Sequence, residues 1–115
     1  LDSKDYIHTS DIARGLNALI KNDLSGLYNL SFGQAIEIKS VLNMIYEKLN
    51  KKFYFDEEKI LNIITFNLSI NKIYADTNWK PTISIWDGIA LLIQETKFKN
   101  RPSLEEFAKR IRSLY

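Results

Sequence analysis

Residues 5–21 read DYIHTSDIARGLNALIK, and two kinds of periodicity meet within this stretch. Asp5 to Thr9 is rich in aromatic and β-branched residues, which favours a strand. Ser10 or Asp11 can then cap a helix, because short polar side chains accept hydrogen bonds from free backbone N–H groups. Apolar residues follow at helical spacing: Ile12, Leu16, Leu19 and Ile20. The stretch therefore predicts a strand leading directly into an amphipathic helix that ends near residues 22–26.

The same alternation continues through the first half of the chain. Leu27 to Ser31 is a second strand candidate, and residues 38–49 carry the strongest helical periodicity of the sequence. Phe53 to Phe55 is a third strand candidate. Strands and helices that alternate with short links imply parallel pairing through right-handed crossovers. The sequence therefore predicts an α/β fold: a small domain of about three short, mostly parallel strands with four to five helices.

The second half is predicted to be mainly helical. Residues 56–69 fit neither a strand nor a helix well, whereas Asn71 to Thr77 favours a short helix. Ser84 is expected to cap a further helix, with Asp87 three residues on. The inner face of that helix is predicted to carry Ile85, Ile89, Leu92 and Ile93. A last amphipathic helix is predicted to begin at Ser103 with a capping box.

Composition excludes several classes of protein. The chain has 115 residues, of which 45% are hydrophobic and 26% charged, so it is one domain in size. It contains no cysteine, which excludes disulfides, Cys-ligated zinc and a thiol nucleophile. No apolar run approaches the length of a membrane span. The net charge of +2 gives no electrostatic case for nucleic acid, and the cluster of Lys48, Lys51 and Lys52 is expected to be a solvated helix end.

Catalytic patterns are scarce. His8 is the only histidine, so it cannot form a multi-histidine metal site, and we expect it to be a structural hydrogen-bonding residue on a strand. Glu57 and Glu58 are expected to be surface acids. Neither a glycine-rich phosphate-binding loop nor a G-x-S-x-G nucleophile motif occurs. From its residues alone, the chain is predicted to be a binding or supporting domain without catalytic or metal-binding residues.

Four segments carry a common pattern: Lys4–Ala13 (KDYIHTSDIA), Gly26–Gly33 (GLYNLSFG), Ile36–Val41 (IEIKSV) and Asp76–Ile89 (DTNWKPTISIWDGI). In this order and spacing they resemble the C-terminal lobe of the extended short-chain dehydrogenase/reductases, the NAD-dependent epimerases and dehydratases that act on nucleotide sugars. The resemblance extends from Asp2 to about Glu95. It implies an α/β lobe that binds the nucleotide sugar.

The resemblance also implies which residues bind substrate. Lys59–Ile63 (KILNI) falls where the family carries R-P-G-D-V. By this alignment Lys59 contacts the diphosphate, Asn62 contacts the nucleotide ribose, and Lys4 also approaches the diphosphate. Lysine offers a flexible point charge where arginine offers a planar fork, and an amide replaces the ribose-binding carboxylate. Two interpretations stay open: a retuned site, or a decayed one in which the loop only packs. Glu37 replaces the family's helix-capping serine, at a cost of about 1 kcal/mol.

Beyond these residues, the resemblance divides the protein. Residues 1–99 are expected to form the substrate-binding lobe, and residues 100–115 an additional amphipathic helix packed on it. The N-terminal Rossmann domain, with its NAD turn and catalytic Tyr-x-x-x-Lys, is expected to lie outside this chain. The chain is then expected to hold no cofactor itself. The parent enzyme would be a cytoplasmic homodimer that binds NAD or NADP and a UDP- or dTDP-sugar, in cell-surface polysaccharide or sugar-nucleotide metabolism. The alternative is a degenerate, non-catalytic lobe that serves assembly through the helix from Ser103 to Tyr115.

Overall fold

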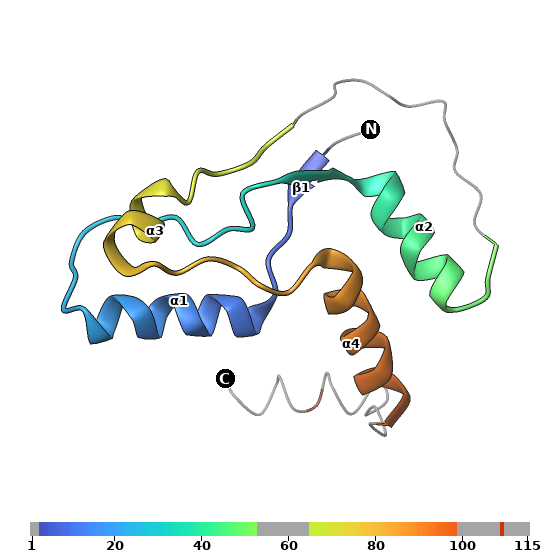
Figure 1. Cartoon of the computed structure of the whole chain (residues 1–115). Coiled ribbons are helices and arrows are strands. Elements are labelled where there is room, and N and C mark those ends of the chain that lie inside the picture. Colours follow the sequence, from blue (N-terminus) through green and yellow to red (C-terminus); the bar gives the residue numbers. More distant parts are fainter. Residues whose placement is uncertain (1–2, 53–64, 99–108, 110–115) are drawn as a thin grey trace.

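The computed structural model describes residues 3–52, 65–98 and 109. Two strands and four helices follow one another in this part of the chain (Figure 1). They are β1 (Ser3–Asp5), α1 (Thr9–Lys21), β2 (Ala35–Glu37), α2 (Ile38–Lys48), α3 (Asn71–Thr77) and α4 (Ile85–Phe98). The helices predicted near residues 12–22, 38–49, 71–77 and 85–93 are therefore confirmed. The strand predicted at 53–55 and the helix predicted from Ser103 lie outside the described residues.

The sheet differs from the prediction. β1 and β2 pair antiparallel, with Ser3 opposite Glu37 and Asp5 opposite Ala35. Thr65 adds an isolated parallel bridge to Ser3. The expectation of about three mostly parallel strands is wrong for the described ranges, and Asp5–Thr9 is not a strand beyond its first residue. The reason is local: His8 already caps α1, so the chain turns into the helix where the β-branched pattern predicted continued extension.

The segment Leu27–Ser31 has a strand-like sequence but forms no strand. Its side chains form hydrogen bonds with the residues just before α3. The Asn29 amide donates to the Ser69 carbonyl at 3.1 Å. The Ser31 hydroxyl donates to the Leu68 carbonyl at 3.0 Å. Within the described ranges no strand lies alongside to form a backbone ladder with it. A strand needs a hydrogen-bonded neighbour, and the local sequence cannot supply one.

Helix starts are capped unevenly. The Nδ1 atom of His8, not Ser10 or Asp11, caps α1 by accepting from the Ser10 N–H at 3.2 Å. Glu37 stands at the start of α2 and makes no capping hydrogen bond, as the missing serine predicts. Ser84 caps α4 as predicted, because its hydroxyl accepts from the Asp87 N–H at 3.1 Å. A side-chain hydrogen bond thus caps α1 and α4, whereas α2 has none.

Helix ends use asparagine or aspartate in place of glycine. Asp23, Asn50 and Asn78 have positive φ angles of 50°, 53° and 60°. The short polar side chains of Asn and Asp tolerate this left-handed conformation better than other non-glycine residues. At the end of α2 the Lys51 N–H donates to the Tyr46 carbonyl at 2.9 Å, which closes the last turn. These residues stop the helices near the positions predicted from sequence.

The core has two parts. α2 and α4 pack together through Val41, Met44 and Ile89. At the other end of the lobe, α1 and α3 lie side by side, and Ile73 and Trp79 are buried (Figure 1). The amphipathic faces are only partly as predicted. On α1 the predicted apolar face is not the buried one: Leu16 and Ile20 are 49% and 76% exposed, whereas Asp11 and Gly15 are buried. On α4, Leu92 is predicted on the inner face but is 56% exposed.

Candidate functional site

Of the three residues predicted to bind substrate, the structure describes Lys4. It lies in the middle of β1, partly buried, opposite Ile36 of β2. Lys59 and Asn62 lie outside the described residues. The role of all three in binding therefore stays a prediction.

Asp5, the neighbour of Lys4, anchors a turn. Its two carboxylate oxygens accept from the backbone N–H groups of Phe32 at 2.8 Å and Gly33 at 2.9 Å. Gly33 has φ of 83°, a conformation that favours glycine. The carboxylate thus joins the first matching segment to the second. Sequence reasoning missed this role, although an acid in one matching segment and a glycine turn in the next were the available signals.

Asp11 is the most buried charged residue in the described part of the chain, with no solvent exposure. Its carboxylate accepts from the backbone N–H groups of Thr82 at 3.1 Å and Ile83 at 2.9 Å. It also forms an ion pair with Arg14 one helical turn further on. The loop that leads into α4 is thus held to α1 by a buried carboxylate, and not by apolar contacts alone.

Hydrogen bonding decides the charge state of Asp11. Burial alone would raise the pKa of this carboxyl, but the Arg14 guanidinium and the N–H groups of Ile83 and Thr82 outweigh it and hold the pKa below the usual 3.8. Arg14 also donates to the Lys80 carbonyl at 3.2 Å. The indole N–H of Trp79 donates to the Asp11 carbonyl at 3.2 Å. Asp11, Arg14 and Trp79 thus join α1 to the segment 79–83, and we call these three residues the clamp.

A third set of contacts holds residues 26–33 to α3. The Tyr28 hydroxyl donates to the Asp76 carboxylate at 2.8 Å, and this hydrogen bond raises the pKa of the phenol above 10.0. The Lys72 ammonium donates to the Leu27 carbonyl at 2.9 Å and lies 4.3 Å from the centre of the Tyr28 ring. These contacts fix the extended segment without a sheet.

The segments that carry the resemblance therefore contact one another. Asp5 joins the first to the second, Asp11 joins the first to the last, and Tyr28 joins the second to the last. The contacts of Asp5, Asp11 and Tyr28 hold these segments of the scaffold together. In the part of the chain that the structure describes, no three acids or histidines gather to hold a metal ion. No described helix is long and apolar enough to cross a bilayer.

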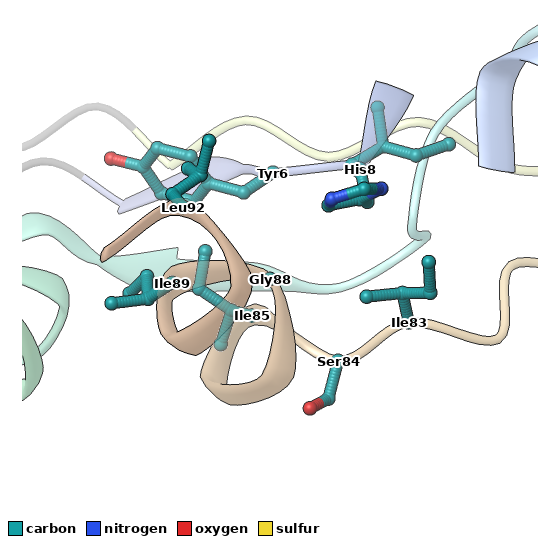
Figure 2. A pocket seen from close by; sticks show the side chains of 9 residues that line it. Tyr6, His8, Ile83, Ser84, Ile85, Gly88, Ile89 and Leu92 are labelled. Carbon is teal, nitrogen blue, oxygen red and sulfur yellow. The ribbon is translucent and has the colours of Figure 1, made fainter. Parts of the chain in front are cut away.

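An apolar cavity of about 140 Å³ lies between the β1–α1 connection and α4 (Figure 2). Its walls are mainly aliphatic and aromatic: Tyr6, Ile7, Ile83, Ile85, Ile89 and Leu92. His8 lies at one end of it, and its ring packs close to Gly88 of α4. The expectation that His8 is a structural hydrogen-bonding residue is confirmed by its bond to Ser10, although it caps a helix and is not on a strand.

Known proteins are similar to this chain in sequence. It is 29% identical over 99 residues to the dTDP-4-dehydro-6-deoxyglucose reductase of Escherichia coli, a match that covers 84% of this chain and 31% of that protein. It is 33% identical to the bifunctional protein GAL10 of Pachysolen tannophilus over 74% of this chain and 14% of that protein. The chain thus spans less than a third of either relative. No protein-family model matches it.

Solved structures show the same fold. The ADP-L-glycero-D-manno-heptose-6-epimerase of Helicobacter pylori superposes with a TM-score of 0.74 at 17% identity, over 85% of this chain and 31% of that one. The Bordetella bronchiseptica enzyme WbmF, solved with NAD+ and UDP, superposes with a TM-score of 0.70 at 24% identity, over 83% and 29%. The resemblance to a C-terminal lobe of the extended short-chain dehydrogenase/reductases is therefore confirmed.

Proposed function

We propose that this chain is the nucleotide-sugar-binding lobe of a longer NAD- or NADP-dependent sugar-nucleotide epimerase, dehydratase or reductase. The observation that carries the proposal is the position of Lys4 in a strand of fixed register. β2 pairs along β1, and Asp5 is bound to the Phe32–Gly33 turn on one side. Successive side chains leave a strand on opposite faces, so Lys4 leaves β1 on the face away from that turn. A cation placed there can contact a diphosphate.

Lysine at this position limits the binding strength. An ammonium group attracts phosphate oxygens as a point charge, whereas a guanidinium binds two of them at once. We assign the second diphosphate contact to Lys59 and the ribose contact to Asn62, by their match to R-P-G-D-V. An amide oxygen can accept one ribose hydroxyl where a carboxylate accepts two. The lobe is therefore expected to bind sugar nucleotides weakly when it is alone.

Redox chemistry is assigned to the rest of the parent enzyme. The sequence of this chain has neither a glycine-rich dinucleotide turn nor a tyrosine followed four residues later by lysine. In the parent, NAD or NADP would accept a hydride from the sugar and return it, or donate one from its reduced form. The residues of this chain contribute by binding and orienting the sugar nucleotide.

The surface of α1 supports a larger parent protein. Leu16 and Ile20 form an exposed apolar stripe on this helix, and Leu27 nearby in the sequence is 84% exposed. The segment Leu27–Ser31 is extended and has no strand beside it within the described ranges. Contiguous exposed apolar patches mark surfaces that a partner covers, and Leu16 and Ile20 lie one helical turn apart on α1. We assign this side to contact with the Rossmann domain.

The test is a titration of the isotopically labelled chain with UDP-glucose and dTDP-glucose, followed by NMR. Saturable shifts are expected at the Lys4 amide. Lys4→Ala should weaken binding about 10-fold, since a hydrogen bond to a charged group contributes roughly 1.5 kcal/mol or more. Lys4→Arg should tighten it, because the planar fork matches a diphosphate.

The matched control is Lys48→Ala, which removes an equal charge from the exposed end of α2. It should leave binding unchanged. Equal losses in Lys4→Ala and Lys48→Ala would show a non-specific charge effect and contradict the site. An absence of any shift at Lys4 would favour the degenerate, non-catalytic lobe.

A further inference from the structure

The cavity between residues 6–8 and α4 has no role in the proposed diphosphate contacts. It is lined mainly by aliphatic and aromatic side chains, and His8 and Ser84 are also among the lining residues. Water needs two to four polar partners in such a space, so an apolar cavity of this kind is a poor site for it. Its volume of about 140 Å³ is close to that of an engineered apolar cavity, about 150 Å³, known to bind benzene. The space fits one aromatic ring.

The shape of the cavity depends on a close approach. A methyl group added at Gly88 would lie 3.4 Å from the Cδ2 atom of His8, so the imidazole rests against the backbone of α4. The hydrogen bond from the Ser10 N–H to Nδ1 holds the ring in this orientation. Figure 2 shows His8 and Ile83 at one end of the space and Tyr6 and Leu92 at the other. An incoming ring would contact the His8 imidazole at one end of the space, and aromatic rings in contact favour edge-to-face or offset-stacked arrangements.

We propose that this cavity receives a phenylalanine-type aromatic side chain from the part of the longer protein that lies outside this chain. The proposal rests on the proposed function, because the similar proteins are at least three times as long as the matched lobe. Leu92 lines the cavity and is 56% exposed, so an entering ring would cover part of this side chain. The cavity is thus a socket that attaches α4 and the β1–α1 connection to the remainder of the enzyme.

Toluene is the probe for the isolated 115-residue chain. Saturable shifts are expected at the Gly88 amide and the methyl groups of Ile85 and Leu92. Leu92→Phe should weaken toluene binding at least fivefold, because its own ring occupies the space. Leu91→Phe is the matched control, since Leu91 is similarly exposed at 42% and does not line the cavity; it should change binding less than twofold.

The same titration on the longer protein tests the occupant. There the cavity resonances should no longer respond to toluene, because the side chain already fills the space. An equal response in both proteins would overturn the proposal, as would the absence of saturable shifts at Gly88 in the isolated chain. Shifts spread equally over Leu16 and Ile20 would also overturn it, by showing adsorption to exposed apolar surface. A failure of the proposed function is distinguishable, because sugar nucleotides are followed at Lys4.

Discussion

Replacing Asp11 tests whether a buried carboxylate holds the lobe together. Asp11→Asn keeps the size of the side chain, and the remaining oxygen can still accept from the Thr82 and Ile83 N–H groups. The new amide cannot accept from Arg14, so the charge-assisted hydrogen bond is lost. Asp11→Ala removes both side-chain acceptors and leaves the Thr82 and Ile83 N–H groups without their partner.

The expected losses follow from these contacts. A hydrogen bond to a charged group contributes about 1.5–3 kcal/mol to stability. The Arg14 side chain is 47% exposed, which places its pair with Asp11 toward the lower end. Asp11→Asn should therefore lower the free energy of unfolding by about 2 kcal/mol. Asp11→Ala should lower it by about 4 kcal/mol, because each unsatisfied N–H adds roughly 1 kcal/mol or more.

Urea unfolding followed by tryptophan fluorescence measures these changes, since Trp79 is buried beside the clamp. With a slope of about 2 kcal/mol per molar urea, the midpoints should fall by about 1 M and 2 M. Asp23→Asn is the control, because Asp23 is exposed at φ of 50°, which asparagine tolerates. Its midpoint should stay within about 0.3 M of the original.

The pH dependence follows from the lowered pKa of Asp11. A folded-state pKa below the unfolded value of 3.8 gives a contribution that is present above that value and is lost as the pH falls through the folded-state pKa. The gap between the original chain and Asp11→Asn should be constant near neutral pH and begin to close below about pH 4. Equal midpoints for Asp11→Asn and Asp23→Asn at neutral pH would refute the clamp.

Three further changes follow from single contacts. Gly15→Ala places a methyl group 2.5 Å from Leu30 and 3.1 Å from the Trp79 ring. Thermal unfolding should show a loss of about 1–3 kcal/mol in stability, although alanine favours a helix more than glycine does. The control Asn17→Ala, on the exposed side of α1, should not lower stability. Glu37→Ser supplies the missing cap of α2 and should raise stability by about 1 kcal/mol, whereas the control Glu47→Ser in the last turn of the same helix should not. An unchanged melting temperature in Glu37→Ser would show that the start of α2 needs no cap. Asp76→Asn removes the carboxylate that raises the pKa of Tyr28, so the titration of the Tyr28 ring resonances followed by NMR should move down toward 10.0. No movement would exclude the Tyr28–Asp76 hydrogen bond.

Helix positions could be predicted because their signals are local. Apolar spacing and polar end residues identified α2 and α3 almost to the residue. The prediction of a strand at Leu27–Ser31 is wrong, because a strand needs a neighbouring strand to pair with and the local sequence does not specify one. The sequence predicts Ser10 or Asp11 as the helix cap, because short polar residues before an apolar helix are typical of caps. The structure instead places the Asp11 carboxylate against another loop. Its true partners, Thr82 and Ile83, lie more than 70 residues away and could not be found from spacing.

The family resemblance identified the correct fold. The matching residues whose contacts the structure describes hold that fold together, so they do not by themselves indicate which substrate is bound. Asp5, Asp11 and Tyr28 match the pattern because they hold loops together. Such residues indicate a fold. We assign substrate binding to Lys4, Lys59 and Asn62, where the sequence departs from the pattern. The titrations with sugar nucleotides test that assignment.

The most direct test of the central claim is to sequence the gene upstream of the codon for Leu1. If the chain is a substrate-binding lobe, the reading frame should continue upstream and encode a glycine-rich dinucleotide turn followed by a Tyr-x-x-x-Lys motif. A stop codon in frame, or a start codon directly before Leu1, would contradict the claim that this lobe serves a longer oxidoreductase-type enzyme.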